Sequence, residues 1–153
     1  MRWAQGPVVS DGAGIMAGMT FQASGSFDIE AWDADKPYDE QGGNRLTRVH
    51  VGKTFHGDLV GTSSTELITV ESPAGPVAYV GIEHVQGILH GREGTFVLQH
   101  SAGSEDGTAD TQWLRWLIVP TSGTGELAGI RGVGQISVTE DGAHTWALEY
   151  TLD

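Results

Sequence analysis

From Thr20 onward, apolar and polar residues alternate in successive runs, and this pattern predicts one β-strand after another. No stretch keeps a helical apolar period over three turns, so little helix is expected. Most of the runs are joined by short turns. This favours an antiparallel meander closed into a single eight-stranded barrel, because an open sheet of such long strands would expose its edges. A two-sheet sandwich is the alternative. The expected strands span residues 20–32, 44–56, 59–72, 77–90, 93–102, 109–119, 130–139 and 143–152.

Three turns predict how four of these strands pair. Residues 57–58 and 91–92 are read as two-residue turns that begin with glycine, and residues 73–76 as a four-residue loop. Counting outward from these turns places Val49 opposite Glu66, Glu66 opposite Glu83, and Glu83 opposite His100. The three turns agree on one shared, mainly apolar face. We therefore expect this face to be the barrel interior, since a slip of one residue would turn a strand inside out.

The expected interior face carries both apolar and polar side chains. Its apolar members are Val49, Val51, Phe55, Val60, Ile68, Val70, Tyr79, Val85, Leu89, Phe96 and Leu98. Its polar members are Lys53, Thr62, Ser64, Glu66, Glu83 and His100.

Glu66, Glu83 and His100 are the candidate catalytic residues, because polar groups facing an apolar interior cost free energy unless they are paired or used. Two carboxylates on neighbouring strands have Cβ atoms about 5 Å apart, so mutual repulsion and burial favour protonation of one of them. The row is either a general acid/base site or a buried hydrogen-bond network. In the second case Ser64, Thr62 and water satisfy the carboxylates, and the network merely determines the strand register.

Ligand-binding residues are expected on the same interior face. The position of the sixth strand depends on the turn near Asp106-Gly107. A loop longer by one residue would bring Trp116 into the interior in place of Trp113. The candidate ligand-binding residues are Lys53, Phe55, Ser64, Tyr79, Phe96, Leu98, Trp113 and Arg115.

Composition narrows the classes of partner. The chain has 8 Lys and Arg against 20 Asp and Glu, and a net charge of −12. This charge argues against binding to nucleic acid or anionic membranes. Cysteine is absent, and no two of the six histidines have the spacing of common metal-ligand pairs. No metal or cofactor is therefore expected, although a Glu66/Glu83/His100 metal site is conceivable geometrically.

The first 19 residues have no periodic pattern and are expected to form a flexible leader before a barrel domain of residues 20–153. The leader lacks the basic and apolar regions of a signal peptide, and a cytoplasmic location is the default expectation. Strands 77–90 and 109–119 have apolar residues on both faces. Such strands indicate a second layer, a homo-oligomer contact or coverage by the leader.

Four segments resemble an uncharacterised bacterial family of small barrels in the allene-oxide-cyclase-like superfamily. They are Lys53–Ser63, Tyr79–Glu83, Gly94–His100 and the glycine-rich segment Gly123–Gly132. The last also resembles a hairpin of dirigent proteins and allene oxide cyclases. The resemblance covers about residues 20–152 and implies an eight-stranded antiparallel barrel with an apolar cavity, often oligomeric. Characterised relatives cyclise or guide reactive apolar intermediates, but this chain differs from the characterised cyclases nearly everywhere outside the glycine-rich hairpin.

Two functional hypotheses follow. In the first, the chain is a cofactor-free isomerase or cyclase whose interior folds an apolar substrate while Glu66 or Glu83 moves a proton or stabilises a cation. In the second, it is a non-catalytic carrier or sensor of an apolar small molecule. An oligomeric structural barrel with a filled interior is a third alternative. The volume of the interior distinguishes them.

Overall fold

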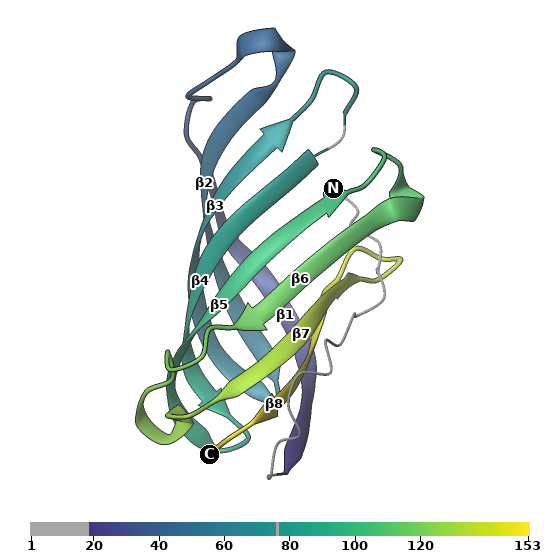
Figure 1. Cartoon of the computed structure of the whole chain (residues 1–153). Coiled ribbons are helices and arrows are strands. Elements are labelled where there is room, and N and C mark those ends of the chain that lie inside the picture. The colour runs from purple at the N-terminus through teal and green to yellow at the C-terminus, as the bar shows by residue number, and fades with distance from the viewer. Residues whose placement is uncertain (1–18, 76) are drawn as a thin grey trace.

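Eight antiparallel strands close into a single barrel in the computed structural model, which describes residues 19–75 and 77–153 (Figure 1). Each strand pairs with its neighbour in sequence, and β1 also pairs with β8. This confirms the predicted all-β barrel and excludes the sandwich. The strands are β1 (Thr20–Ala34), β2 (Arg45–Gly57), β3 (Leu59–Glu71), β4 (Val77–Leu89), β5 (Arg92–Ser104), β6 (Gln112–Ile118), β7 (Arg131–Val138) and β8 (His144–Thr151).

Helix is limited to three single turns in the loops of the described residues. They are η1 (Gln41–Gly43), η2 (Ala109–Thr111) and η3 (Gly125–Leu127). None of the described helices is long and apolar enough to cross a membrane. The predicted leader falls outside the described residues except for Met19.

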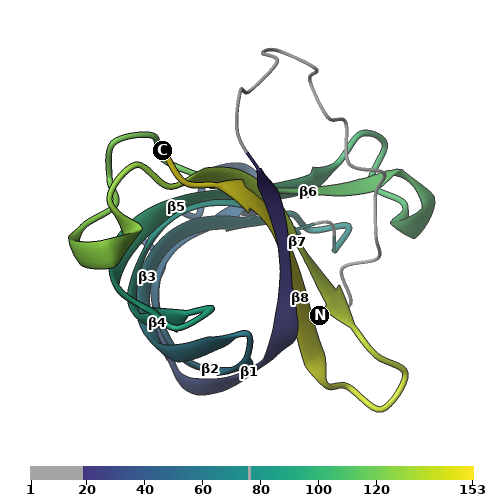
Figure 2. The ribbon, with the colours of Figure 1, turned by 90° about the horizontal axis from the view of Figure 1, so that it is seen from below.

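One end of the barrel is packed. Figure 2 views the ring of strands from this end, where the β2–β3, β4–β5 and β6–β7 connections lie. Leu127 and Ile130, from the long β6–β7 connection, are fully buried there. They join a core that includes Leu59, Leu89 and Phe96. The connection can pass this closely because Gly94 has no side chain: a Cβ there would lie 2.1 Å from the Thr124 carbonyl oxygen.

The predicted register of β3 is wrong by one residue on both sides. His50 pairs with Glu66, where Val49 was expected, and Thr65 pairs with Glu83, where Glu66 was expected. On the β4 side, Glu71 pairs with Val77, one residue earlier than the predicted loop at 73–76 would place it. On the β2 side, the physical reason lies in the β2–β3 turn. β2 continues through Gly57, whose φ is 103°, so Asp58 alone separates the two strands.

The side chains of β3 are therefore inverted relative to the prediction, while those of β2, β4 and β5 face the predicted way. Leu59, Thr65 and Leu67 point inward and are buried. Val60 and Ile68, expected inside, are 59% and 42% exposed. Thr62 and Ser64 are exposed as well.

The β4–β5 turn consists of His90 and Gly91, with φ values of 47° and 79°. Both values are positive, as in the type I′ turn that suits a two-residue hairpin. The sequence predicts a turn at Gly91 and Arg92, with Glu83 opposite His100. The observed register places Gly81 opposite His100, a difference of two residues. A shift of two keeps every side chain on its predicted face.

A β-bulge in β1 changes which side chains face the interior. Ile29 pairs with Lys53 and Trp32 pairs with Val51, while the register shifts at the residues between them. Without this extra residue, Ile29 and Trp32 would point to opposite faces. Because of the bulge, both side chains face the interior, in the half of the barrel opposite the packed end.

Candidate functional site

Glu83 on β4 lies at the centre of a buried polar cluster, and its side chain is 0% exposed. Its Oε1 accepts hydrogen bonds from His100 Nε2 at 2.6 Å, Lys53 Nζ at 3.2 Å and Trp116 Nε1 at 3.2 Å. Its Oε2 accepts one from Ser63 Oγ at 2.5 Å. The donors come from β2, β3, β5 and β6, so the carboxylate joins five of the eight strands.

The cluster holds Glu83 in its ionised form. Burial alone would raise the pKa of Glu83, but the charge of Lys53 and hydrogen bonds from His100 and Ser63 lower it well below its usual range. Lys53 is itself only 7% exposed, so the ion pair is largely removed from water. The buried pair carries no net charge, which reduces the cost of enclosing it.

His100 on β5 is the neutral partner in this cluster. Burial lowers the pKa of His100, and although Glu83 opposes this effect, the Lys53 charge adds to it. A neutral imidazole carries one ring proton. Since the ionised Glu83 can only accept, that proton lies on Nε2, and Nδ1 has a free lone pair.

Two buried side-chain atoms in the described residues have no hydrogen-bond partner: His100 Nδ1 and Thr65 Oγ1. Such atoms are uncommon in folded proteins, because each loses its bond to water on burial. Thr65 and His100 are 1% and 3% exposed, respectively. Both residues line the cavity of the barrel.

This cavity occupies the half of the barrel opposite the packed end and has a volume of about 550 Å³. It reaches from the β7–β8 loop and the ends of β3 and β4 down to the polar cluster. Lys53, Thr65 and His100 contribute polar groups at its inner end. Most of its wall is apolar or aromatic, including Phe27, Ile29, Trp32, Leu67, Leu114 and Ile136.

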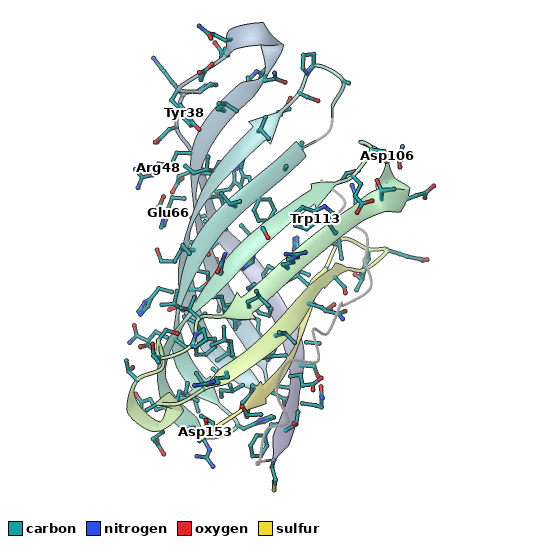
Figure 3. All side chains as sticks on the ribbon, in the orientation of Figure 1. Tyr38, Arg48, Glu66, Asp106, Trp113 and Asp153 are labelled. Atoms are coloured by element: carbon teal, nitrogen blue, oxygen red, sulfur yellow. The ribbon has the colours of Figure 1, made fainter. Side chains whose placement is uncertain are left out.

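The structure brings two of the three candidate catalytic residues together. Glu83 and His100 are in direct contact, whereas Glu66 lies on the outer surface with its side chain 48% exposed (Figure 3). There Glu66 pairs with Arg48 at 3.2 Å and His50 at 3.0 Å, and these two hydrogen bonds lower its pKa. The expected interior position of Glu66 is wrong because β3 is inverted.

The candidate ligand-binding residues fall into three groups. Lys53 and Tyr79 line the cavity as expected. Phe55, Phe96 and Leu98 point inward but are buried in the packed core, away from the cavity lining. Ser64, Trp113 and Arg115 point outward, Ser64 because of the β3 register and the other two because Trp116 pairs with His100.

The β5–β6 register resolves the alternative left open by the sequence. Trp116, at 2% exposure, faces the interior, and Trp113 is 37% exposed. On the outside, the Arg115 guanidinium lies 5.7 Å from the ring centroid of Trp113. The inward indole then donates to Glu83, a contact that no sequence pattern signalled.

Sequence reasoning also missed Ser63 and Thr65. Both belong to the β3 face that was assigned to the outside, and both are small polar residues without a distinctive motif. Residues 19–75 and 77–153 hold no group of three His, Asp or Glu side chains suited to a metal ion. The conceivable Glu66/Glu83/His100 metal set is separated by the barrel wall.

Comparison with known proteins gives a family without an assigned activity. The model of the family described as "Protein of unknown function (DUF3224)" matches residues 23–150. A crystal structure of a DUF3224 protein of unknown function from Shewanella oneidensis MR-1 is 34% identical, with a TM-score of 0.77. The match covers 88% of this chain and 99% of that one. No curated protein matches the chain.

Proposed function

The chain belongs to the DUF3224 family, and we propose that it binds an apolar small molecule inside the barrel. The carrying observation is the pair of buried, unpartnered atoms, Thr65 Oγ1 and His100 Nδ1, on residues that line an apolar cavity. A ligand with one polar end and an apolar body fits this arrangement. Its polar end would contact Thr65 and His100, and its body would replace water along the apolar wall of the cavity.

The volume and lining of the cavity support this proposal. About 550 Å³ lies within the range of pockets that hold drug-sized molecules. A mainly apolar wall with a few polar groups at one end is typical of such pockets, since the wall supplies affinity and the polar groups orient the ligand. A structural barrel with a filled interior is disfavoured by the same volume.

The polar cluster favours a specific ligand orientation. Glu83 is saturated by its four donors and is closed off from solvent, so it serves the site through its neighbours. His100 offers an acceptor, while the hydroxyl of Thr65 can donate or accept. A hydroxyl or carbonyl group therefore suits this end of the cavity.

An isomerase or cyclase is the second candidate function. The observation that favours it is the 2.6 Å contact between Glu83 Oε1 and His100 Nε2, because a carboxylate that holds one imidazole nitrogen leaves the other available for proton transfer. The resemblance to allene-oxide-cyclase-like barrels supports the same class. A carrier needs only the cavity, and an isomerase needs the cavity and a reactive His100.

The binding proposal is tested with N-phenyl-1-naphthylamine, an uncharged apolar probe whose fluorescence rises in apolar surroundings. We expect saturable binding of one probe per chain and energy transfer from Trp32, which lines the cavity. The Trp32→Phe variant should bind the probe but lose part of the energy transfer. A probe signal that rises without saturation in the folded protein would contradict the proposal.

A further inference from the structure

We propose that His100 is a general base that removes a proton from the carbon next to the carbonyl of an apolar ketone or aldehyde. In this scheme Glu83 is a positioning residue, and the product is an isomer with a moved double bond or an inverted centre. The inference rests on the ligand binding proposed above. It adds a reaction class, a substrate class and roles for Lys53, Thr65 and His100.

The geometry of the Glu83–His100 pair carries the argument. Glu83 Oε1 lies 2.6 Å from His100 Nε2, so the carboxylate determines which nitrogen bears the proton and orients the ring. Nδ1 is consequently the basic nitrogen. It has no partner in the described protein, and His100 belongs to the cavity lining.

The carbonyl oxygen of the substrate has two candidate donors. Thr65 carries an unpartnered hydroxyl, and Lys53 places an ammonium group at the same inner end of the cavity. Lys53 Nζ is 3.2 Å from Glu83 and 4.8 Å from the ring centroid of Phe27, so two neighbours hold it in position. Donors that are fixed before the reaction stabilise negative charge on oxygen without reorganisation.

The proposed step is balanced within the substrate and His100. The carbon–hydrogen bond breaks, its proton moves to Nδ1, and its electron pair forms an enolate whose oxygen contacts Thr65 and Lys53. The imidazolium then returns the proton to the same carbon or, in a β,γ-unsaturated ketone, to the γ-carbon. The second outcome moves the double bond into conjugation, and neither outcome requires an oxidant or a cofactor.

The other groups that face His100 are compatible with this role. Glu83 on β4 stabilises the imidazolium as it forms, and Lys53 on β2 favours the neutral base beforehand. Tyr79 on β4 has its ring centroid 6.2 Å from that of His100. Burial and the Glu83 charge raise the pKa of Tyr79, so its phenol stays protonated and does not compete as a base. Trp116 on β6 packs edge-on against the imidazole.

The test uses 2-tetralone, an apolar bicyclic ketone with exchangeable hydrogens next to its carbonyl. Binding is measured by quenching of tryptophan fluorescence, and hydrogen–deuterium exchange of bound ketone in deuterated buffer is followed by NMR. We expect exchange above the buffer rate. His100→Gln should slow the protein-dependent exchange by ~100-fold or more, the size of a typical general-base contribution, while 2-tetralone still binds. His84→Gln, an outward histidine on β4, is the matched control and should leave both quantities unchanged.

The outcomes separate the two proposals. If 2-tetralone binds without exchange above buffer, or if His100→Gln exchanges as fast as the wild type, the general-base role is wrong and ligand binding stands. If N-phenyl-1-naphthylamine binds and 2-tetralone does not, the carbonyl substrate class is wrong. If neither probe binds, the proposed function itself fails.

A second measurement applies even if His100→Gln does not fold. It uses His144→Gln, because His144 also lines the cavity and burial also lowers its pKa. Because burial lowers the pKa of His100 from 6.5, the exchange rate of this variant should persist below pH 6.5 and fall only when Nδ1 of His100 is protonated. Protein-dependent exchange that instead halves at pH 6.5 or above would assign the base to an ordinary exposed histidine and overturn the inference.

Discussion

Glu83 and Glu66 lie on adjacent strands with their side chains on opposite faces of the barrel wall. Glu83 is fully buried against Lys53, and Glu66 is 48% exposed beside Arg48. The same substitution at the two positions therefore compares how much a buried ion pair and a surface ion pair contribute to stability.

Glu83→Gln is expected to lower the free energy of unfolding by about 3–5 kcal/mol, because it leaves the Lys53 charge buried without its partner. Glu66→Gln should cost no more than about 1 kcal/mol, as is usual for an exposed pair. Chemical denaturation measures both values. Equal losses would contradict the assigned faces, and the double variant Lys53→Met/Glu83→Gln should recover part of the stability by removing both charges.

Stability should decrease in acid in two stages. The pKa of His100 is lowered from 6.5, so its contribution is complete above pH 6.5 and is lost as pH falls toward the lowered value. The pKa of Glu83 is lowered from 4.5, so its contribution is lost only below pH 4.5. Thermal unfolding across this range should show His100→Gln less pH-dependent than the wild type between pH 6.5 and 4.5. An unchanged profile would mean that His100 is not held neutral.

Blocking the cavity should weaken ligand binding without unfolding the barrel. Val138 and Val133 both lie on β7, but Val138 lines the cavity, and Val133 is 36% exposed and outside its lining. Val138→Trp should weaken binding of N-phenyl-1-naphthylamine roughly tenfold or more, because the added ring occupies the ligand's space. Val133→Trp is the matched control. Equal affinities of the two variants would place the probe elsewhere.

A substitution at the packed end should lower the stability of the barrel without changing ligand binding in the cavity. His90 Nδ1 and the Tyr150 hydroxyl are 2.5 Å apart there, and His90 Nε2 lies 3.6 Å from Asp58. Tyr150→Phe removes one hydrogen bond and should lower the free energy of unfolding by about 1 kcal/mol. Probe affinity should not change. A large loss of affinity would show that this end also contributes to binding.

The barrel, its strand order and most strand bounds could be predicted because alternation and turn residues act locally. The orientation of β3 could not. Its even-numbered positions include Val60 and Ile68, and its odd-numbered positions include Leu59 and Leu67, so either face reads as an interior. Only tertiary structure distinguishes them: the observed register pairs Thr65 with Glu83 and avoids enclosing a second carboxylate in the same interior.

The site was predictable to the same partial extent. Glu83 and His100 were placed together because the error in the β4–β5 turn was two residues, which preserves the face. The bulge that turns Trp32 inward and the loop length that brings in Trp116 depend on local backbone geometry. Neither feature changes the alternation of apolar and polar residues along the sequence.

Native mass spectrometry of the protein purified from the organism that encodes it tests the central claim most directly. The account predicts a non-covalent complex with one apolar compound per chain, present in the wild type and Val133→Trp and absent from Val138→Trp. A ligand-free mass for the wild type, or a compound retained equally by Val138→Trp, would contradict a ligand bound in the cavity opposite the packed end.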